Sequence, residues 1–412
     1  MSRRPLSGTL SLTLAAIAAT ACSDHHSTAP QGSSSRASAE PVSQGVLAMD
    51  VSPSSVGWQE QARTLAAAAN MSPLAAARVY AALGVAEYRA MMAIPDHEIS
   101  DGLPENGVGK GGRRLLEAQR GAVAGASARV LSFFFPGAAV SLEQRARAEG
   151  ESGPGNIHPH FARGVAIGQS AGDALVERVK TDRFTSPWTG PVPAGPGKWI
   201  ANGPPAGATF GGVAPYFLES GSQFRPPPPP AFDSPGFLAG TSEIRALAAT
   251  RTPAQTASAL YWNFPTGTFT PVGYWNLVAA DYVKAYRLDE RRATYTFALV
   301  NAAMMDALIG CWDAKYYYWT IRPSQADPLI TLTFGLPNHP SYPSGHSCVS
   351  AAAATVLGHL FPERGSEVET WLMDAGLSRM YAGIHYRFDI DAGRDLGVAV
   401  GEWAIGHASR LE

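Results

Sequence analysis

The amino-acid sequence predicts an all-α protein, a bundle of packed helices joined by long loops rich in proline and glycine. Apolar residues recur with the period of an amphipathic helix through most of the chain. Strict alternation of apolar and polar residues, which is typical of a half-buried strand, is absent. Hydrophobic residues make up 45% of the chain, enough for a large core, and the 42 glycines and 32 prolines indicate extensive turns and loops.

The balance of charge excludes one broad class of function. The chain of 412 residues has 32 Lys and Arg against 34 Asp and Glu, a net charge of −2. A nucleic-acid-binding protein usually carries a basic patch large enough to appear in the total. We therefore expect no nucleic-acid partner.

The N-terminal residues 1–21 have the features of a secretory signal. Arg3 and Arg4 precede an apolar, alanine-rich stretch that ends just before Cys22. This order resembles a bacterial lipoprotein signal, in which the cysteine is lipidated, although cleavage without lipidation stays open. The stretch is too short and too polar for a transmembrane helix, which needs about 20 apolar residues, and we expect no later span. The protein is thus expected to be exported, as a periplasmic or cell-envelope lipoprotein or otherwise as a secreted protein.

Two loop-like regions divide the rest of the chain. Residues 22–50 are rich in Ser, Ala and Pro and predict a flexible linker. Residues 51–412 are expected to form a single helical domain. Within it, residues 183–236 form what we call the Pro/Gly-rich excursion, whose many aromatic residues favour an ordered loop over a disordered one.

Helical periodicity marks a series of segments in this domain. They are residues 74–93, 113–135, 160–180, 240–258, 272–288, 291–319, 344–360, 366–381 and 386–409. The pattern is strongest in 291–319, which is long enough for about eight turns. Cys311 and Cys348 could be bridged in an exported protein or could be two buried thiols, and the absence of a Cys-x-x-Cys pair excludes a thiolate zinc site.

Three segments within 311–409 carry residues suited to binding an oxyanion. Lys315, Arg322 and Arg379 are cations beside apolar runs, in a chain with only 16% charged residues. Arginine offers a planar fork of donors to an oxyanion, and lysine a compact charge.

The second segment, Pro-Ser-Gly-His, predicts a helix N-terminus with room for an anion. Ser344 follows a proline and precedes helical periodicity, which is the place of an N-cap. Free N–H groups of the first turn bind anions, and Gly345 permits close approach of the backbone. His346 lies in the same turn, placed to exchange protons with the ligand.

His385 and Asp389 lie four residues apart and so share one face if this stretch is helical. A carboxylate bonded to one ring nitrogen fixes the tautomer and leaves the other nitrogen as a nucleophile or a metal ligand. Each of these residues alone is more often structural, but their joint order and spacing favour a site.

The pattern Lys-x6-Arg-Pro, then Pro-Ser-Gly-His, then Ser-Arg-x5-His-x3-Asp resembles the phosphatidic acid phosphatase type 2 and vanadium-dependent haloperoxidase superfamily. The stretch 310–316 and the FRPPPPP segment are similar to bacterial vanadium-dependent haloperoxidases. The resemblance implies a helical bundle of the acid phosphatase and vanadium haloperoxidase type. It also raises a homodimer as an open prediction.

For a haloperoxidase, the resemblance implies vanadate as cofactor, with phosphate able to occupy the same site. His385 would ligate vanadium, and His346 would be the acid–base group. The residues implied to bind the other oxygens of vanadate are Lys315, Arg322, Ser344, Gly345 and Arg379. Lys315 would also polarise hydrogen peroxide, and a halide and a small organic acceptor would be the other substrates.

The alternative is an exported non-specific acid phosphatase that hydrolyses phosphate esters. The resemblance then implies that His385 forms a phosphohistidine, that His346 protonates the leaving alcohol and that Asp389 orients His385. Both chemistries can use the same set of oxyanion-binding residues, which we call the cage. The reason is that trigonal-bipyramidal vanadate has the shape and charge of the phosphoryl-transfer transition state.

Aromatic residues around the first motif favour the haloperoxidase. Trp312 precedes Lys315 by three residues, and residues 316–319 are all aromatic, which suits a halide site with polarisable walls. His339 precedes His346 by seven residues, an offset at which algal bromoperoxidases also carry a histidine. A solvent-facing loop histidine is the alternative. A third class, a phosphate-binding protein that retains the fold without turnover, also stays open.

Overall fold

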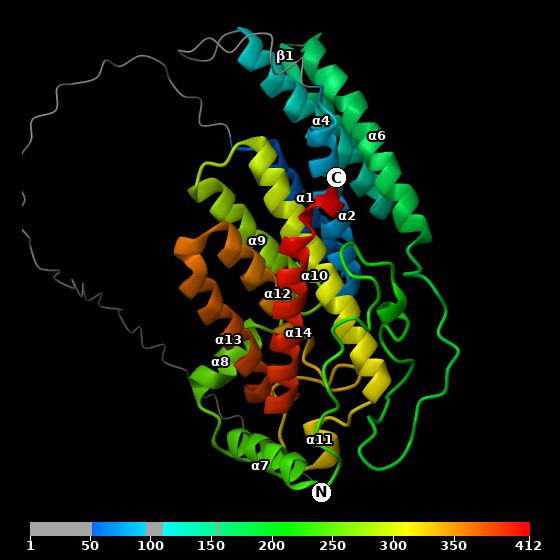
Figure 1. Cartoon of the computed structure of the whole chain (residues 1–412), viewed down its shortest axis with the longest axis vertical. Helices are drawn as coiled ribbons and strands as arrows, with labels where there is room; N and C mark the ends of the chain where they lie inside the picture. Colours follow the sequence, from blue (N-terminus) through cyan, green and yellow to red (C-terminus); the bar gives the residue numbers. More distant parts are fainter. Residues whose placement is uncertain (1–51, 96–109, 154–155) are drawn as a thin grey trace, which may run out of the picture. The chain divides into compact units, whose positions relative to one another are not determined.

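The structure, a computed structural model, describes residues 52–95, 110–153 and 156–412. The expected signal at 1–21, the linker at 22–50 and Cys22 lie outside the described residues. Export and lipidation therefore stay predictions. The described residues belong to one compact unit. They are mostly helical, with almost no strand (Figure 1), which confirms the predicted fold class.

The described helices are joined by connections of very different lengths, the longest between Thr181 and Pro235. They are α1 (Ser54–Ala68), α2 (Pro73–Met92), α4 (Lys110–Phe134), α5 (Ala139–Glu149), α6 (Pro159–Thr181), α7 (Pro235–Thr250), α8 (Pro253–Tyr261), α9 (Thr270–Ala285), α10 (Glu290–Tyr318), α11 (Pro323–Ala326), α12 (Gly345–Leu360), α13 (Gly365–Tyr381) and α14 (Arg387–Gly406). Short 3₁₀ turns lie at Pro136–Ala138, Phe210–Gly212, Pro362–Arg364 and Ala408–Leu411. The strands β1 (Glu151–Gly153) and β2 (Asn156–Ile157) form a small antiparallel pair.

The segment 240–258, predicted as one helix, is two helices. Thr252 begins α8 with a capping box, in which its hydroxyl accepts the N–H of Gln255 and the Gln255 side chain accepts the N–H of Thr252. Pro253 has no N–H with which to continue α7. The apolar periodicity runs across this break, so periodicity alone missed it.

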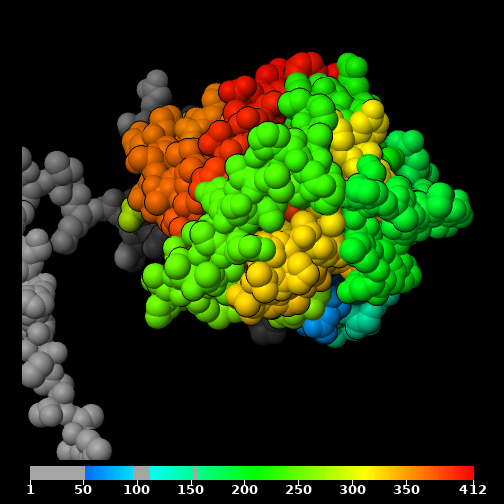
Figure 2. Space-filling model, turned by 90° about the horizontal axis from the view of Figure 1, so that it is seen from below, coloured from blue at the N-terminus to red at the C-terminus, as the bar shows by residue number. Residues whose placement is uncertain are grey.

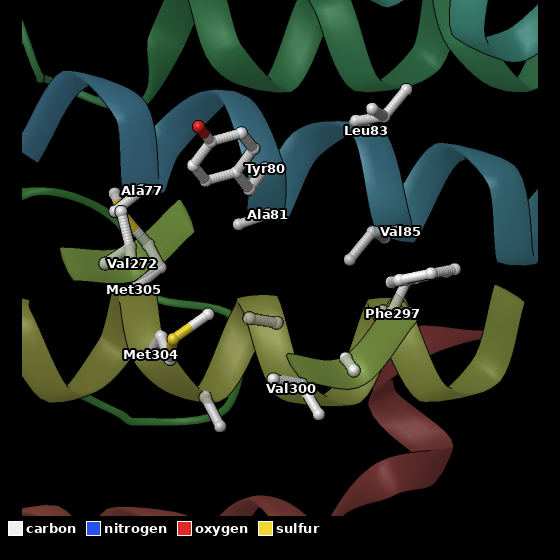
Figure 3. Packing of buried hydrophobic residues seen from close by; sticks show 14 of the residues in the cluster. Ala77, Tyr80, Ala81, Leu83, Val85, Val272, Phe297, Val300, Met304 and Met305 are labelled. Atoms are coloured by element: carbon white, nitrogen blue, oxygen red, sulfur yellow. The ribbon is translucent and has the colours of Figure 1, made fainter. Parts of the chain in front are cut away.

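Helix α10 is the centre of the bundle. It packs against α2, α9, α12 and α14 (Figure 1), and Figure 3 shows apolar side chains of α2 facing those of α10. A Cβ atom at Gly84 of α2 would lie 2.9 Å from the carbonyl oxygen of Phe297, so glycine lets the two helices approach closely.

The sequence led us to expect no apolar segment of membrane-spanning length after the signal. Helix α10 corrects this expectation. Among the described helices it is the one long and apolar enough to span a bilayer. However, 94% of its most apolar window is buried inside the fold. Its composition reflects a central place in the core.

The Pro/Gly-rich excursion is ordered and fastened to the bundle. The N–H of Ala206 donates to the carbonyl of Asn338 over 2.9 Å. The buried carboxylate of Asp306 in α10 accepts three successive backbone N–H groups at residues 216–218, over 2.7 to 3.0 Å. In Figure 2 the green surface, which includes the excursion, borders the yellow-orange surface of the loop after α10. The excursion therefore lies beside the loop that follows α10.

Candidate functional site

The three sequence motifs meet where α10 ends and where α12 and α14 begin. Trp319 closes α10 in the left-handed conformation, so the chain turns sharply between Lys315 and Arg322. The segment that follows leads to Ser344, the N-cap of α12, whose hydroxyl accepts the N–H of Ser347. The backbone N–H of Ser344 donates to the carbonyl of Asp389 over 2.9 Å, which joins the starts of α12 and α14.

A cavity of about 90 Å³ lies at this junction. Its polar wall comprises Asn263, His339, Gly345, His346, Arg379 and His385, and its other walls are Trp312 and the apolar residues Pro73, Pro271, Val272, Leu308, Phe334, Pro337, Val349 and Ile384. A water molecule occupies about 30 Å³ in the liquid. The cavity therefore has room for a small oxyanion.

Lys315 is fully buried but does not line the cavity. Its Nζ donates to the carbonyl oxygens of Pro340 over 3.0 Å, Ser341 over 2.8 Å and Pro343. Burial lowers the pKa of its ammonium to about 8, partly offset by attraction to Cys311. All three ammonium protons are thus used by the loop, and a bound anion would have to compete with these carbonyls.

Arg322 connects two histidine rings. One guanidinium nitrogen donates to Nε2 of His385 over 3.1 Å and to the carbonyl of Ile384 over 2.8 Å. The other donates to Nδ1 of His339 over 3.1 Å and to its carbonyl over 3.0 Å. Because a guanidinium only donates, Nε2 of His385 acts as an acceptor. Nδ1 of His339 also lies 3.2 Å from the carbonyl of Pro340. Burial lowers the pKa of Arg322 to about 10.

His385 is held by Asp389 in one tautomer. Its Nδ1 lies 2.8 Å from Oδ2 of Asp389, which also accepts the hydroxyl of Ser341 over 2.6 Å and the N–H of Tyr386 over 3.2 Å. Burial, reinforced by Arg322 and Lys315, lowers the pKa of His385 well below its usual range. The ring is therefore neutral, protonated on Nδ1, and it presents the Nε2 lone pair to the site.

His346 is set in the opposite tautomer. Its Nε2 lies 2.8 Å from the carbonyl of Trp262, which can only accept, so Nε2 carries the proton. Burial and the charge of Arg379 lower its pKa well below the usual range. Nδ1 is then the nitrogen able to accept a proton.

Arg379 supplies the most direct sign of an anion. Its Nε donates to the hydroxyl of Ser378 over 2.9 Å and one terminal nitrogen donates to the carbonyl of Ala259 over 2.7 Å. The other terminal nitrogen, Nη1, is buried without a partner. Leaving a buried donor unsatisfied costs about 1–3 kcal/mol, and an oxyanion in the cavity would satisfy it. Burial lowers the pKa of Arg379 to about 9.

Gly345, Trp312 and His339 complete the cavity wall. A Cβ atom at Gly345 would lie 3.2 Å from the Trp312 ring, so glycine lets the indole close over the start of α12. The rings of Trp312 and His339 lie 5.0 Å apart. The structure thus places His339 on the cavity wall, and burial with the charges of Lys315 and Arg322 lowers its pKa well below the usual range.

The donor set fits phosphate or vanadate. The unpartnered Nη1 of Arg379, the Nε2 lone pair of His385 and the start of α12 all belong to the cavity or its wall. The described residues hold no cluster of three or more His, Cys, Asp or Glu side chains arranged for a metal ion. The cysteines Cys311 and Cys348 are buried free thiols.

Sequence reasoning missed two contributors to this site. Ser341 carries a signal in hindsight, since it is a small polar residue between two prolines directly before the Pro-Ser-Gly-His motif. The Trp262 carbonyl that holds His346 has none, because it is a backbone atom brought in by the end of α8.

Comparisons with known proteins agree with this geometry. The PAP2 superfamily matches residues 293–409. A non-specific acid phosphatase of Salmonella typhi is 30% identical over 188 residues, which are 43% of this chain and 70% of that protein. A vanadium chloroperoxidase of Curvularia inaequalis is 29% identical over 156 residues, 30% of this chain and 25% of that protein.

A solved structure extends the likeness beyond the motifs. A bacterial vanadium-dependent iodoperoxidase superposes with a TM-score of 0.71 at 24% identity, over 89% of this chain and 97% of that one. At this identity the match establishes the fold. The match to the Salmonella typhi phosphatase covers 70% of that protein. The chain therefore belongs to the PAP2 superfamily and is an enzyme of the group that includes the vanadium haloperoxidases.

Proposed function

We propose that this enzyme is a vanadate-dependent haloperoxidase, which oxidises a halide with hydrogen peroxide to a hypohalite-like halogenating species. The observation that carries the proposal is the small, largely apolar cavity with the unpartnered Nη1 of Arg379 and the Nε2 of His385 beside the Trp312–His339 pair. Such a space admits an oxyanion, peroxide and a halide ion.

The residues that would hold vanadate follow from the hydrogen bonds. Nε2 of His385 would be the ligand to vanadium, because Asp389 keeps the proton on Nδ1. Arg379 would donate to vanadate from Nη1. Arg322 would donate to vanadate from the terminal nitrogen that now contacts Nε2 of His385. Ser344, the N–H of Gly345 and the Lys315 charge would complete the cage. When bound, vanadate would activate hydrogen peroxide for oxygen transfer to a halide.

His346 would move the proton. Its Nε2–H is held by the Trp262 carbonyl, so Nδ1 is free to take a proton from peroxide and return it to the departing water. Its lowered pKa keeps the ring in the neutral, proton-accepting form at neutral pH.

Trp312 and His339 would handle the halide. The indole offers a polarisable apolar surface, and the neutral imidazole adds no charge that would hold the halide too tightly. Apolar walls also limit access of water to the oxidising species.

The second candidate is a non-specific acid phosphatase. It is favoured by the match to the Salmonella typhi enzyme and by the Nε2 lone pair of His385, which suits attack on phosphorus. His385 would then form the N–P bond while His346 protonates the departing alcohol oxygen. The largely apolar lining of the cavity and the Trp312–His339 pair favour the haloperoxidase over this choice.

We also propose that the enzyme acts outside the cytoplasm, on the strength of the signal expected at residues 1–21. Detection of a processed N-terminus in a cell-envelope or culture fraction would test this.

The function is tested on protein stripped of phosphate and then left empty or incubated with orthovanadate. Each form receives hydrogen peroxide with iodide, bromide or chloride, and separately a chromogenic phosphate ester. Halogenation that requires vanadate, and is lost in His385→Ala, supports the haloperoxidase. Ester hydrolysis by the empty form, inhibited by vanadate and without halogenation, would support the phosphatase instead. Tight anion binding with neither activity would indicate a binding protein.

A further inference from the structure

A second, larger pocket adjoins the cavity and has no part in the proposed oxidation of a halide. It measures about 450 Å³ and opens between the C-terminal end of α10 and the Pro/Gly-rich excursion. Residues of α10 that line it are Trp312, Asp313, Tyr316 and Tyr317, and Arg183 and Arg225 line it from the excursion. This volume lies in the range of about 300–1,000 Å³ that is usual for small-molecule sites.

Trp312 is a wall common to both spaces. Its side chain is part of the lining of both the small cavity and the larger pocket. The excursion fixes it there, because its Nε1 donates to the carbonyl of Ala206 over 3.2 Å, and the same oxygen accepts the hydroxyl of Tyr316 over 2.7 Å. A Cβ atom at Gly207 would lie 2.7 Å from the indole nitrogen, and the φ of +72° at this residue also favours glycine.

The two spaces differ in size, and we assign them different steps of the reaction. The cavity of about 90 Å³ has room for the small reactants of halide oxidation. The larger pocket of about 450 Å³, which Trp312 also lines, has room for an organic molecule. An acceptor bound there would meet the halogenating species close to its source.

Aromatic rings in the larger pocket favour a flat ligand. Tyr317 is 61% exposed and offers a ring face to the pocket region. The Arg225 guanidinium lies 3.9 Å from the centroid of that ring, and this cation–π contact holds the Tyr317 ring in position. Stacking of a ligand ring on such aromatic side chains contributes about 0.5–1.5 kcal/mol beyond area burial.

The charges in the pocket favour an anion. Arg225 and Asp313 form a two-pronged ion pair at 2.7 and 3.1 Å, so these two charges offset each other. Arg183 is exposed and has no ion-pair partner among the residues that the structure describes. The net charge left on the lining is therefore positive.

We propose that this pocket binds the organic acceptor, and that the acceptor is a planar, electron-rich aromatic molecule with an acidic group, such as a phenol carboxylate. This rests on the proposed haloperoxidase function. In the reaction, the halide loses two electrons to peroxide, whose O–O bond breaks. An electron pair of the ring carbon forms the carbon–halogen bond, and that carbon loses its proton. One aromatic molecule, one halide ion, one peroxide and one proton thus give one halogenated product and two water molecules.

The test begins with binding, which needs no turnover. Isothermal titration calorimetry of the full-length protein with 4-hydroxybenzoate, and with its neutral isostere 4-hydroxybenzamide, measures the preference for an anion. We expect 4-hydroxybenzoate to bind more tightly, and Arg183→Gln to weaken it by about fivefold, as for a partly exposed ion pair. Tyr317→Ala should weaken both ligands. Matched controls are Arg292→Gln and Tyr286→Ala, which change an exposed arginine and tyrosine away from the pocket.

Kinetics then connect binding to the reaction. With vanadate and iodide, the two pocket variants should raise the KM for 4-hydroxybenzoate iodination relative to the rate of triiodide formation measured without acceptor. Equal affinity for the two ligands, no binding, or variants indistinguishable from the controls would overturn the proposal. If binding depends on Arg183 and Tyr317 but the unchanged enzyme halogenates nothing, the haloperoxidase assignment fails and the acceptor role fails with it, while the aromatic-anion site stands.

Discussion

The hydroxyl of Ser341 donates to the same oxygen of Asp389 that accepts Nδ1–H of His385, over 2.6 and 2.8 Å respectively. Ser341 is thus a positioning residue that acts on His385 through the carboxylate. Because Oδ1 of Asp389 has no partner, this shared oxygen alone fixes the direction of the carboxylate.

Replacing Ser341 by alanine should loosen this arrangement. We expect Ser341→Ala to lower the affinity for phosphate or vanadate by about tenfold and the free energy of unfolding by about 1–3 kcal/mol. ¹⁵N NMR of the histidine side chains should show a smaller population of the Nδ1–H tautomer at His385. Ser341→Thr should restore it, and Ser347→Ala, which removes a buried hydroxyl without a partner, is the control. An unchanged tautomer would refute the positioning role.

Arg379 offers a test that separates binding from stability. Arg379→Met removes a buried cation whose Nη1 is unpartnered, so the empty protein should unfold at an unchanged or higher temperature. Its affinity for phosphate should fall by at least about tenfold, because a charge-assisted bond is lost. Thermal unfolding with and without phosphate measures both effects. A variant that phosphate still stabilises as strongly as it does the unchanged protein would contradict the assignment.

Lys315 predicts opposite pH dependences for binding and for stability. Its pKa is lowered from 10.5 to about 8 in the folded protein, so between these values the unfolded chain holds more protons. The contribution of Lys315 to the free energy of unfolding therefore rises with pH from about 8 to about 10. Phosphate affinity should fall over the same interval as the ammonium loses its charge. Both trends should be weaker but not absent in Lys315→Met, because Arg379, whose pKa is lowered to about 9, also titrates in this interval. Parallel trends in the two quantities would be evidence against the pKa of Lys315.

His346 should matter for turnover more than for binding. His346→Ala should retain vanadate affinity but lower the rate of halide oxidation by about two to four orders of magnitude. His359→Ala, an exposed histidine at the far end of the same helix, is the matched control. Full activity of His346→Ala would show that another group moves the proton.

His339 should influence the choice of halide. We expect His339→Ala to change the relative rates with iodide, bromide and chloride, because it alters the wall beside Trp312. Vanadate affinity should change little, since Arg322 keeps its contacts with Ile384 and His385. Steady-state rates with each halide, beside vanadate titrations, measure this, and an unaltered halide series would remove His339 from the halide site.

The sequence allowed the fold class and most of the site to be predicted, because both depend on local patterns. Periodicity located α10 and α12, and motif spacing brought His346 and His385 to one cavity. The division of α7 from α8 was missed, since the apolar stripe continues across Thr252. The carbonyls around Lys315 could not be predicted either, because they depend on the path of a loop with no periodicity.

The attachment of the excursion at Asp306 has a practical consequence for protein engineering. Three backbone N–H groups bind this carboxylate, and the buried side chains of Phe217 and Leu218 pack the anchor into the core. The stretch between this anchor and the end of α6 contains Arg183 and Ala206. Substitutions confined to its exposed residues, such as Arg183, can therefore be used to select new ligands by directed evolution while Ala206 keeps its contacts with Trp312 and Asn338.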